Sequence, residues 1–204
     1  MIKKSQYFVL AANNNNDDAS LDKKDSPIFS PSSNEIYFYD DVTRQSIYNL
    51  NRQINETSKL LGSLQNQYNL INDPRIKLYV SSDGGDVFPS LSSLDRIKNN
   101  KIPIDTYVEG LVASAATLIS VVGHRRYMSK NAFVLIHEVR SEFWGNFTEF
   151  QDENKNMNLL MKCIKKIYFE HTKLKEDELD DILKHDVYLD ANEALKYGIV
   201  DEII

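Results

Sequence analysis

The sequence has few residues that bind metals or form covalent cross-links. Its single cysteine, Cys163, cannot form an internal disulfide bond. This cysteine and the four histidines do not have the spacing of a zinc site, so we expect no metal centre. The shortage of cysteine also favours a reducing compartment, and we expect a cytoplasmic protein.

Long apolar runs and an excess of positive charge are missing as well. No stretch approaches the roughly 18 consecutive apolar residues of a membrane-spanning helix. The amino terminus, MIKKSQYFVLAANNNN, resembles a signal peptide faintly, but its apolar run at 7–12 is shorter than the ~7–15 residues of a signal-peptide core. The net charge of −6 argues against nucleic acid, because duplex binding requires a basic face. We expect neither a membrane nor a nucleic acid as partner.

Composition divides the chain into two parts. Residues 11–34 are mostly Asn, Asp, Ser, Lys and Pro, and such a segment cannot bury enough apolar surface to offset the entropy lost on ordering. We interpret residues 1–34 as a mobile N-terminal arm. The remainder, 35–204, is long and apolar enough to form one domain with a core.

Strand and helix patterns alternate along this domain. Runs of β-branched and aromatic residues predict strands at 35–39, 75–80, 104–110, 125–129 and 133–139. Apolar residues at helical spacing predict helices after Thr43, around 91–97, over 111–123, 147–171 and 175–183, and after Asp190, where Glu193 completes a capping box. The alternation predicts an α/β fold of repeated βαβ units around a largely parallel sheet.

Two short motifs stand out at predicted strand ends. SSDGG follows the strand at 75–80, and paired glycines there allow positive φ and an exposed N–H that could hold an oxyanion. The alternative is a plain tight turn. LVASAATLI places Ser114 near a strand-to-helix junction, where a serine hydroxyl can act as a nucleophile. The alternative is a small residue in a packed helix, whose hydroxyl bonds back to the backbone.

A serine nucleophile needs a histidine base that is oriented by a carboxylate. Among the four histidines, His137 closes the apolar run AFVLIH at a predicted strand end, on the sheet edge where Ser114 and the glycine turn are expected. Asp186, in KHDVYLDANEA, could be the orienting carboxylate. A histidine in this position can equally be a structural residue with satisfied hydrogen bonds.

The order and spacing of these motifs resemble those of the Clp protease proteolytic subunit (ClpP) family. The matching segments are YVSSDGGDVFPSLSSLDRIK, VEGLVASAATLI, MSKNAFVLIHE and HDVYLDANEALKYGIVDEII, and the resemblance extends over roughly 35–204. It implies a ClpP/crotonase-like fold with a protruding handle helix at about 147–171. The Asn-rich sequence would suit a divergent, phage-encoded member.

The same resemblance implies a serine-type endopeptidase. Ser114 would be the nucleophile, His137 the general base and Asp186 its partner. The backbone amides of Gly85 and Ala115 would form the oxyanion hole. No cofactor is implied in this chain, because ATP would be used by a partner unfoldase.

The resemblance also implies an assembly. We expect a homo-oligomeric, heptameric ring that could stack in pairs around a closed chamber. The partner would be an Hsp100-class AAA+ unfoldase, and the substrates would be unfolded polypeptides. The N-terminal arm does not match the family's pore-lining segment and could be a removable propeptide.

Several departures from the family pattern keep alternatives open. Asp83 replaces the proline that usually precedes the two glycines, and it adds a negative charge beside the expected oxyanion hole. RSEFWGN replaces the glycine-rich strand that aligns the substrate, and Lys184-His185 replaces the charged pair thought to lock ring to ring. The main alternative is therefore a catalytically silent ring subunit with a structural or regulatory role. A crotonase-like acyl-CoA enzyme is a third interpretation.

Overall fold

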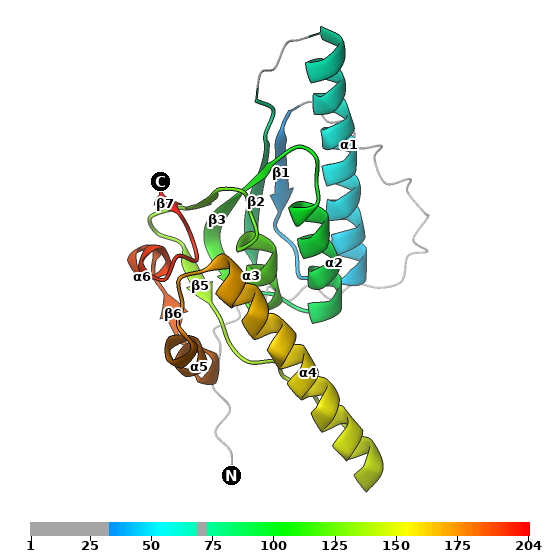
Figure 1. The fold of residues 1–204 in the computed structure, drawn as a ribbon, viewed down its shortest axis with the longest axis vertical. Helices are drawn as coiled ribbons and strands as arrows, with labels where there is room; N and C mark the ends of the chain where they lie inside the picture. Colours follow the sequence, from blue (N-terminus) through cyan, green and yellow to red (C-terminus); the bar gives the residue numbers. More distant parts are fainter. Residues whose placement is uncertain (1–32, 69–72) are drawn as a thin grey trace, which may run out of the picture.

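The computed structural model describes residues 33–68 and 73–204, so the predicted N-terminal arm (1–34) lies almost entirely outside the described residues. Strands and helices alternate along the described chain (Figure 1). In order they are β1 (Glu35–Phe38), α1 (Arg44–Tyr68), β2 (Ile76–Ser82), α2 (Val87–Lys98), β3 (Ile104–Ala113), α3 (Ala115–Ser120), β4 (Arg126–Met128), β5 (Phe133–Leu135), α4 (Phe147–His171), α5 (Glu176–Lys184), β6 (Tyr188–Leu189), α6 (Ala191–Lys196) and β7 (Glu202–Ile203).

The strands form one sheet in the order β1-β2-β3-β4-β7, and neighbours along this path are parallel. β3 has two successive partners: Thr106 to Val108 pair with β4, and Leu111 to Ala113 pair with β5. Gly110 lies between these two stretches with a φ of 58°, which glycine adopts at little cost. β5 also pairs with β6, antiparallel. The predicted α/β fold with a largely parallel sheet is confirmed.

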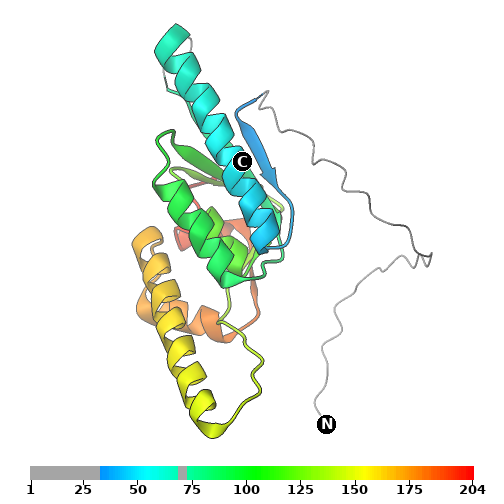
Figure 2. The same cartoon turned by 90° about the vertical axis from the view of Figure 1, so that its right-hand side faces the viewer.

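The two faces of the sheet differ. In β2, Ile76, Leu78 and Val80 are buried, and the side chains between them are half exposed, because successive residues of a strand point to opposite faces. Helices α1 and α2 lie side by side against one face (Figure 1 and Figure 2). The other face carries a row of stacked tyrosines with ring centroids 4.7–4.8 Å apart, contributed in turn by Tyr37, Tyr79, Tyr107 and Tyr127.

Side-chain caps define where several helices begin. Thr43 Oγ1 accepts a hydrogen bond from the Ser46 N–H at 3.1 Å, which caps α1 as predicted. Asp190 and Glu193 form the predicted capping box of α6. Helix α4 covers the predicted range and projects away from the sheet with its N-terminal end outermost (Figure 1). Its buried residues, Ile164, Ile167 and Tyr168, all lie in its C-terminal half.

Two predicted boundaries are wrong near the candidate site. The helix predicted over 111–123 begins only at Ala115, because Leu111 to Ala113 extend β3 and pair with β5. Pairing with β5 therefore decides the conformation of three residues of mixed propensity, since Leu and Ala favour helices and Val favours strands. The strand predicted over 133–139 ends at Leu135, and residues 136–146 have no regular secondary structure. We call residues 136–146 the strap.

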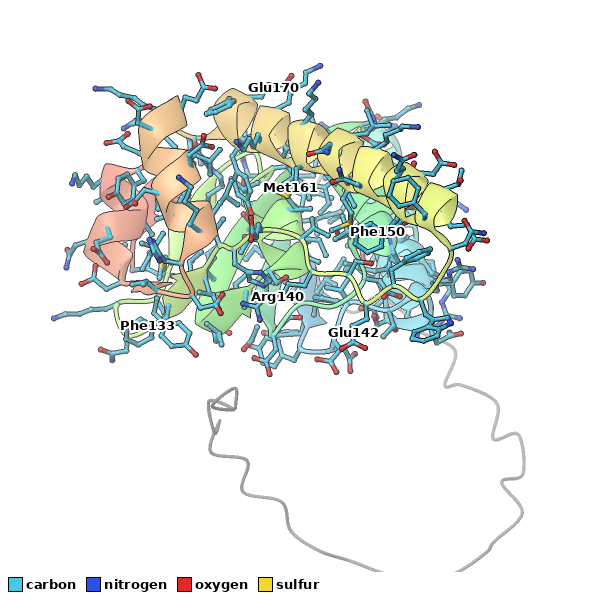
Figure 3. The ribbon with its side chains drawn as sticks, turned by 90° about the horizontal axis from the view of Figure 1, so that it is seen from below. Phe133, Arg140, Glu142, Phe150, Met161 and Glu170 are labelled. Atoms are coloured by element: carbon cyan, nitrogen blue, oxygen red, sulfur yellow. The ribbon has the colours of Figure 1, made fainter. Side chains whose placement is uncertain are left out.

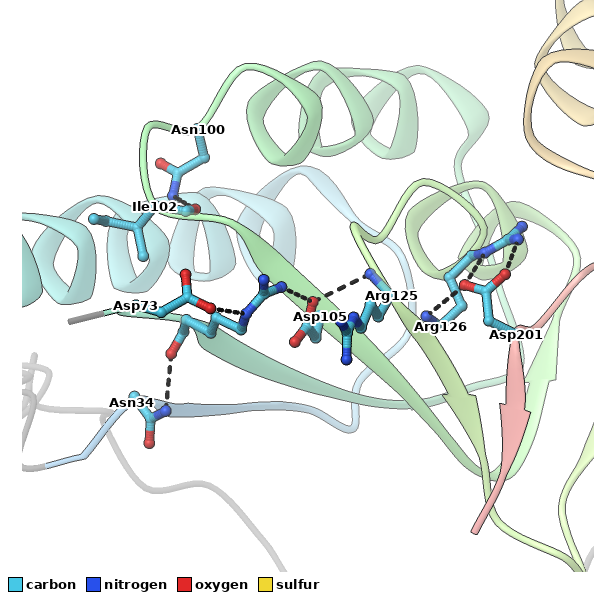
Figure 4. Close-up of polar contacts among 9 residues, drawn as sticks. Asn34, Asp73, Asn100, Ile102, Asp105, Arg125, Arg126 and Asp201 are labelled. Atoms are coloured by element: carbon cyan, nitrogen blue, oxygen red, sulfur yellow. Dashed lines mark hydrogen bonds and ion pairs between the residues drawn. The ribbon is translucent and has the colours of Figure 1, made fainter. Parts of the chain in front are cut away.

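Two arginines form ion pairs between segments that are distant in the sequence (Figure 4). Arg126 pairs with Asp201 at 2.5 Å and also donates to the carbonyl oxygens of His171 and Gly198. Its guanidinium thus joins β4 to the end of α4 and to the turn after α6. Arg75 pairs in the same way with the buried Asp105 at 3.2 Å. In the described part of the chain, no helix is long and apolar enough to cross a membrane.

Candidate active site

Ser114 occupies the junction between β3 and α3 in a strained conformation. Its φ of 54° and ψ of −127° make it the one non-glycine residue with positive φ in the described ranges. Its N–H donates to the Leu135 carbonyl at 2.8 Å, and its own carbonyl accepts from the Thr117 N–H at 3.0 Å. Such strain costs of order 1–3 kcal/mol and persists only where the surroundings enforce it, which is typical of functional sites. A sharp strand-to-helix turn of this kind exposes the hydroxyl of a nucleophilic serine.

The glycine turn packs directly against this serine. Gly84 has a φ of 100°, and a Cβ there would lie 2.7 Å from Ser114 Cβ. Gly85 has a φ of 137°, and a Cβ there would lie 2.4 Å from the Val42 carbonyl oxygen. Backbone bonds around Val42 hold the turn, since its N–H donates to the Gly84 carbonyl at 2.6 Å. Both positions therefore require glycine, and the turn is more specialised than an ordinary tight turn.

Two backbone amides next to Ser114 are free. Within the described residues, neither the Gly85 N–H nor the Ala115 N–H donates a hydrogen bond to another group. Both residues line one pocket with Ser114, of about 220 Å³. Paired free amides beside a nucleophile can stabilise the oxyanion of a tetrahedral intermediate. Asp83 is exposed and does not line the Ser114 pocket, but it lines a neighbouring cleft that shares Gly85 with that pocket.

His137 lines the same pocket as Ser114. It follows β5 by two residues and is half buried. Its Nδ1 lies 2.7 Å from the Glu138 carbonyl oxygen. A carbonyl can only accept, so Nδ1 carries the proton and Nε2 is left with the lone pair of a general base. In the described chain no hydrogen bond joins His137 to the Ser114 hydroxyl, and the closing contact of a dyad is not made in this conformation.

Asp186 lies outside this pocket. It is exposed, between α5 and β6, and it forms an ion pair with Arg140 of the strap. Nevertheless, the antiparallel register of β5 and β6 joins Val134 to Leu189 and Leu135 to Tyr188. Continuing that register by two residues places His137 opposite Asp186. Of the five site residues predicted from sequence, the structure gathers four in one pocket and leaves the carboxylate paired elsewhere.

Two functional positions were missed by sequence reasoning. Tyr168 of α4 is 2% exposed, and its hydroxyl lies 2.5 Å from Thr117 Oγ1. Thr117 donates its own proton to the Ser114 carbonyl at 2.6 Å, so Tyr168 must be the donor to Thr117. Burial raises the pKa of Tyr168 well above its usual value, which keeps the phenol neutral. The hydrogen bonds from Tyr168 to Thr117 and from Thr117 to the Ser114 carbonyl support the backbone of Ser114. In the sequence, Tyr168 is recognisable only as one member of an apolar helical stripe.

The rest of the pocket is mostly apolar. Its remaining lining includes side chains from α2, α3, the strap and α4, namely Val87, Leu118, Val139, Ile164 and Tyr168. Two backbone N–H groups help to hold the strap beside the pocket: the Glu138 N–H donates to the Leu183 carbonyl at 3.0 Å, and the Val139 N–H to Met161 Sδ at 3.4 Å. Figure 3 shows the strap passing alongside α4, with Met161 between them. No cluster of three His, Cys, Asp or Glu residues that could hold a metal ion occurs in the described residues.

Comparisons with known proteins bear on the family and the fold of this chain. The family model for Clp protease matches residues 32–204. The ATP-dependent Clp protease proteolytic subunit of Deinococcus radiodurans is 28% identical over 134 residues, which are 65% of this chain. The match spans 66% of that relative's length, slightly under two thirds. A solved structure of a ClpP1 point mutant from Listeria monocytogenes has a TM-score of 0.72 and 22% identity, covering 84% of this chain and 91% of that chain. The predicted fold is thereby confirmed.

Proposed function

Because the chain belongs to the Clp protease family and holds a strained serine beside two free amides, we propose that it is a serine endopeptidase, the proteolytic subunit of an ATP-dependent Clp protease. The observation that carries the proposal is the backbone of Ser114, at a φ of 54° and a ψ of −127°. Serine has no intrinsic preference for this conformation, and a packing role would not require it. A requirement to expose a nucleophilic hydroxyl at this turn explains the strained backbone of Ser114.

The proposed reaction is acyl transfer to Ser114 followed by hydrolysis. The hydroxyl oxygen attacks the carbonyl carbon of a peptide bond while its proton passes to Nε2 of His137. The Gly85 and Ala115 amides hold the oxyanion that forms. The proton then moves from His137 to the departing amine, which leaves an acyl-enzyme on Ser114. A water molecule, deprotonated by His137, releases the acyl group and restores the serine.

Asp186 completes the proposed triad. In this structure the His137 Nδ1–H donates a hydrogen bond to the neutral Glu138 carbonyl, which fixes the tautomer but supplies no full negative charge. A carboxylate in its place would stabilise the imidazolium that forms during attack. The β5–β6 register supports this role, because its continuation by two residues beyond the pair Leu135–Tyr188 would set Asp186 opposite His137.

The assembly forms part of the same proposal. A homo-oligomeric, heptameric ring would enclose the sites in a chamber, either single or stacked in a pair, and an Hsp100-class AAA+ unfoldase would feed unfolded polypeptides into it. The protruding half of α4, with exposed Phe147, Phe150 and Leu159, supports a contact between copies, because large apolar side chains on a projecting helix gain from being covered. In this role α4 is the handle helix.

A fluorophosphonate probe tests the chemistry. Assembled protein should label, and Ser114→Ala should not, while Ser120→Ala, which removes another serine hydroxyl from α3, should still label. Labelling that persists in Ser114→Ala would exclude Ser114 as the nucleophile. If the assembled wild type does not label and cleaves no unfolded casein with its unfoldase, the chain is instead a silent ring subunit.

A further inference from the structure

The ion pair between Arg140 and Asp186 has no role in the proposed reaction, although it engages the carboxylate of the proposed triad. Arg140 stands three residues after His137 and also lines the Ser114 pocket. Both charged side chains are partly exposed, Arg140 by 64% and Asp186 by 39%. The Arg140 guanidinium is therefore bound to Asp186 at the surface, where it can also separate from the carboxylate and be hydrated.

We propose that Arg140 is a positioning residue: it competes with His137 for Asp186 and holds the site in a resting form until the two separate. This inference rests on the proposed function, since it assigns a regulator to the same site. In this structure each of the two groups is bound to another partner. Asp186 has Arg140 as its partner, and His137 has the Glu138 carbonyl as a substitute partner.

The register of β5 and β6 defines the alternative arrangement. Residues directly opposite in an antiparallel pair have Cβ atoms about 4.5–5.5 Å apart, within reach of a histidine–carboxylate hydrogen bond. Extending the pairing of Leu135 with Tyr188 by two residues brings His137 and Asp186 into this relationship. The strap departs from that register immediately after β5, and its course puts Arg140 next to Asp186 instead.

Release of Arg140 needs no large refolding. The ion pair joins two side chains, so rotation of the Arg140 side chain can break it while the backbone bond from the Glu138 N–H to the Leu183 carbonyl stays in place. An alternative acidic partner lies close by: Glu153 of α4 lines the same groove as Arg140 and accepts a hydrogen bond from the neighbouring Ser141 hydroxyl at 3.0 Å. Figure 3 shows Arg140 on the strap beneath α4. Transfer of the guanidinium toward Glu153 would free Asp186 to accept the His137 Nδ1 proton.

The proposal predicts a gain from removing a charge. An exposed ion pair of this kind shifts an equilibrium by roughly two- to fivefold, so Arg140→Gln should raise the rate of fluorophosphonate labelling of Ser114 by about that factor. Arg140→Lys keeps the charge and should remain slow. Arg96→Gln is the matched control, because Arg96 lies on α2 and does not line the Ser114 pocket. All variants are compared in the same assembled form, which is checked by size-exclusion chromatography.

Salt gives a second readout that a merely structural role would not produce. Raising ionic strength from ~0.05 to ~0.5 M screens exposed pairs, so wild type should gain labelling rate relative to Arg140→Gln. A crystal structure of Arg140→Gln should show Asp186 within hydrogen-bond distance of His137 Nδ1, and one of Arg96→Gln should not.

The outcomes separate the two proposals. If wild type labels and Arg140→Gln labels no faster, or Arg140→Lys labels as fast as Arg140→Gln, the competition is overturned. It is also overturned if Asp186 stays away from His137 in the Arg140→Gln crystal structure. If neither wild type nor Arg140→Gln labels while the crystal structure shows Asp186 on His137, the competition stands and the peptidase activity fails.

Discussion

Gly84 lies so close to Ser114 that a Cβ added to the glycine would come within 2.7 Å of the serine Cβ. The added atom would also lie 3.2 Å from the Ala115 nitrogen, one of the two free amides. The turn and the nucleophile are therefore one packed unit, and a change in the first displaces the second.

Gly84→Ala should impair both stability and chemistry. Its φ of 100° is unfavourable for alanine and the clash adds to this, so we expect a loss of about 2–3 kcal/mol in the free energy of unfolding. Displacement of the Ser114 hydroxyl should slow probe labelling by about 10- to 100-fold. Denaturant unfolding and labelling rates measure the two effects.

Gly62→Ala is the matched control for that variant. Nothing lies within 4 Å of a Cβ there, and the residue is inside α1, where alanine is favoured over glycine by about 0.5–1 kcal/mol. It should stabilise the protein slightly and leave labelling unchanged. Equal behaviour of the two variants would mean that the close approach of Gly84 to Ser114 is not required.

Ser114→Gly should stabilise the protein while abolishing labelling. Glycine accepts the φ of 54° without the strain that serine bears, whereas Ser114→Ala keeps a Cβ and the strain. We expect Ser114→Gly to be about 1 kcal/mol more stable than Ser114→Ala. Equal unfolding midpoints for these two variants would contradict stored strain at this residue.

Tyr168→Phe should cost about 1 kcal/mol of stability, because Thr117 Oγ1 loses a buried hydrogen-bond donor. Thr117 still donates to the Ser114 carbonyl, so labelling should fall by only about threefold or less, in keeping with one weakened support. Tyr188→Phe, at a side chain that is 49% exposed, should leave stability within about 0.5 kcal/mol of wild type. A larger effect at Tyr188 than at Tyr168 would overturn this account.

His171 should make stability fall as the solution becomes acidic. Burial, followed by the positive charges of Lys98 and Arg126, lowers the pKa of His171 below its usual 6.5, against an opposing effect of Glu170. Well above pH 6.5 the residue is neutral in both the folded and the unfolded state, because its folded-state pKa lies below that value. Below that value the unfolded chain binds a proton first, and the free energy of unfolding decreases until the folded protein also takes up the proton.

Comparison with His171→Gln isolates this contribution. The variant should lose less stability than wild type between about pH 6.5 and 5, as followed by urea unfolding at each pH. Parallel curves for the two proteins over that range would show that burial of His171 does not influence its titration.

Much of the fold follows from local pattern. The helices after Thr43 and after Asp190 begin at the caps that the sequence predicts, and the strands rich in β-branched residues lie where their composition predicts. These features depend on neighbours within a few residues, which a sequence displays directly. The resemblance to a known family added Ser114, His137, Gly85 and Ala115 as a set, and all four line one pocket.

Long-range pairing decided the rest. Leu111 to Ala113 continue the apolar run of the following helix, yet they form a strand because β5 offers them hydrogen-bond partners. This pairing places Ser114 at a strained junction instead of within a helix. No local pattern reveals that continuing the β5–β6 register would set His137 opposite Asp186, because this depends on the pairing of two strands separated by more than 50 residues. Which partner Asp186 takes is a competition between side chains that only the folded chain brings together.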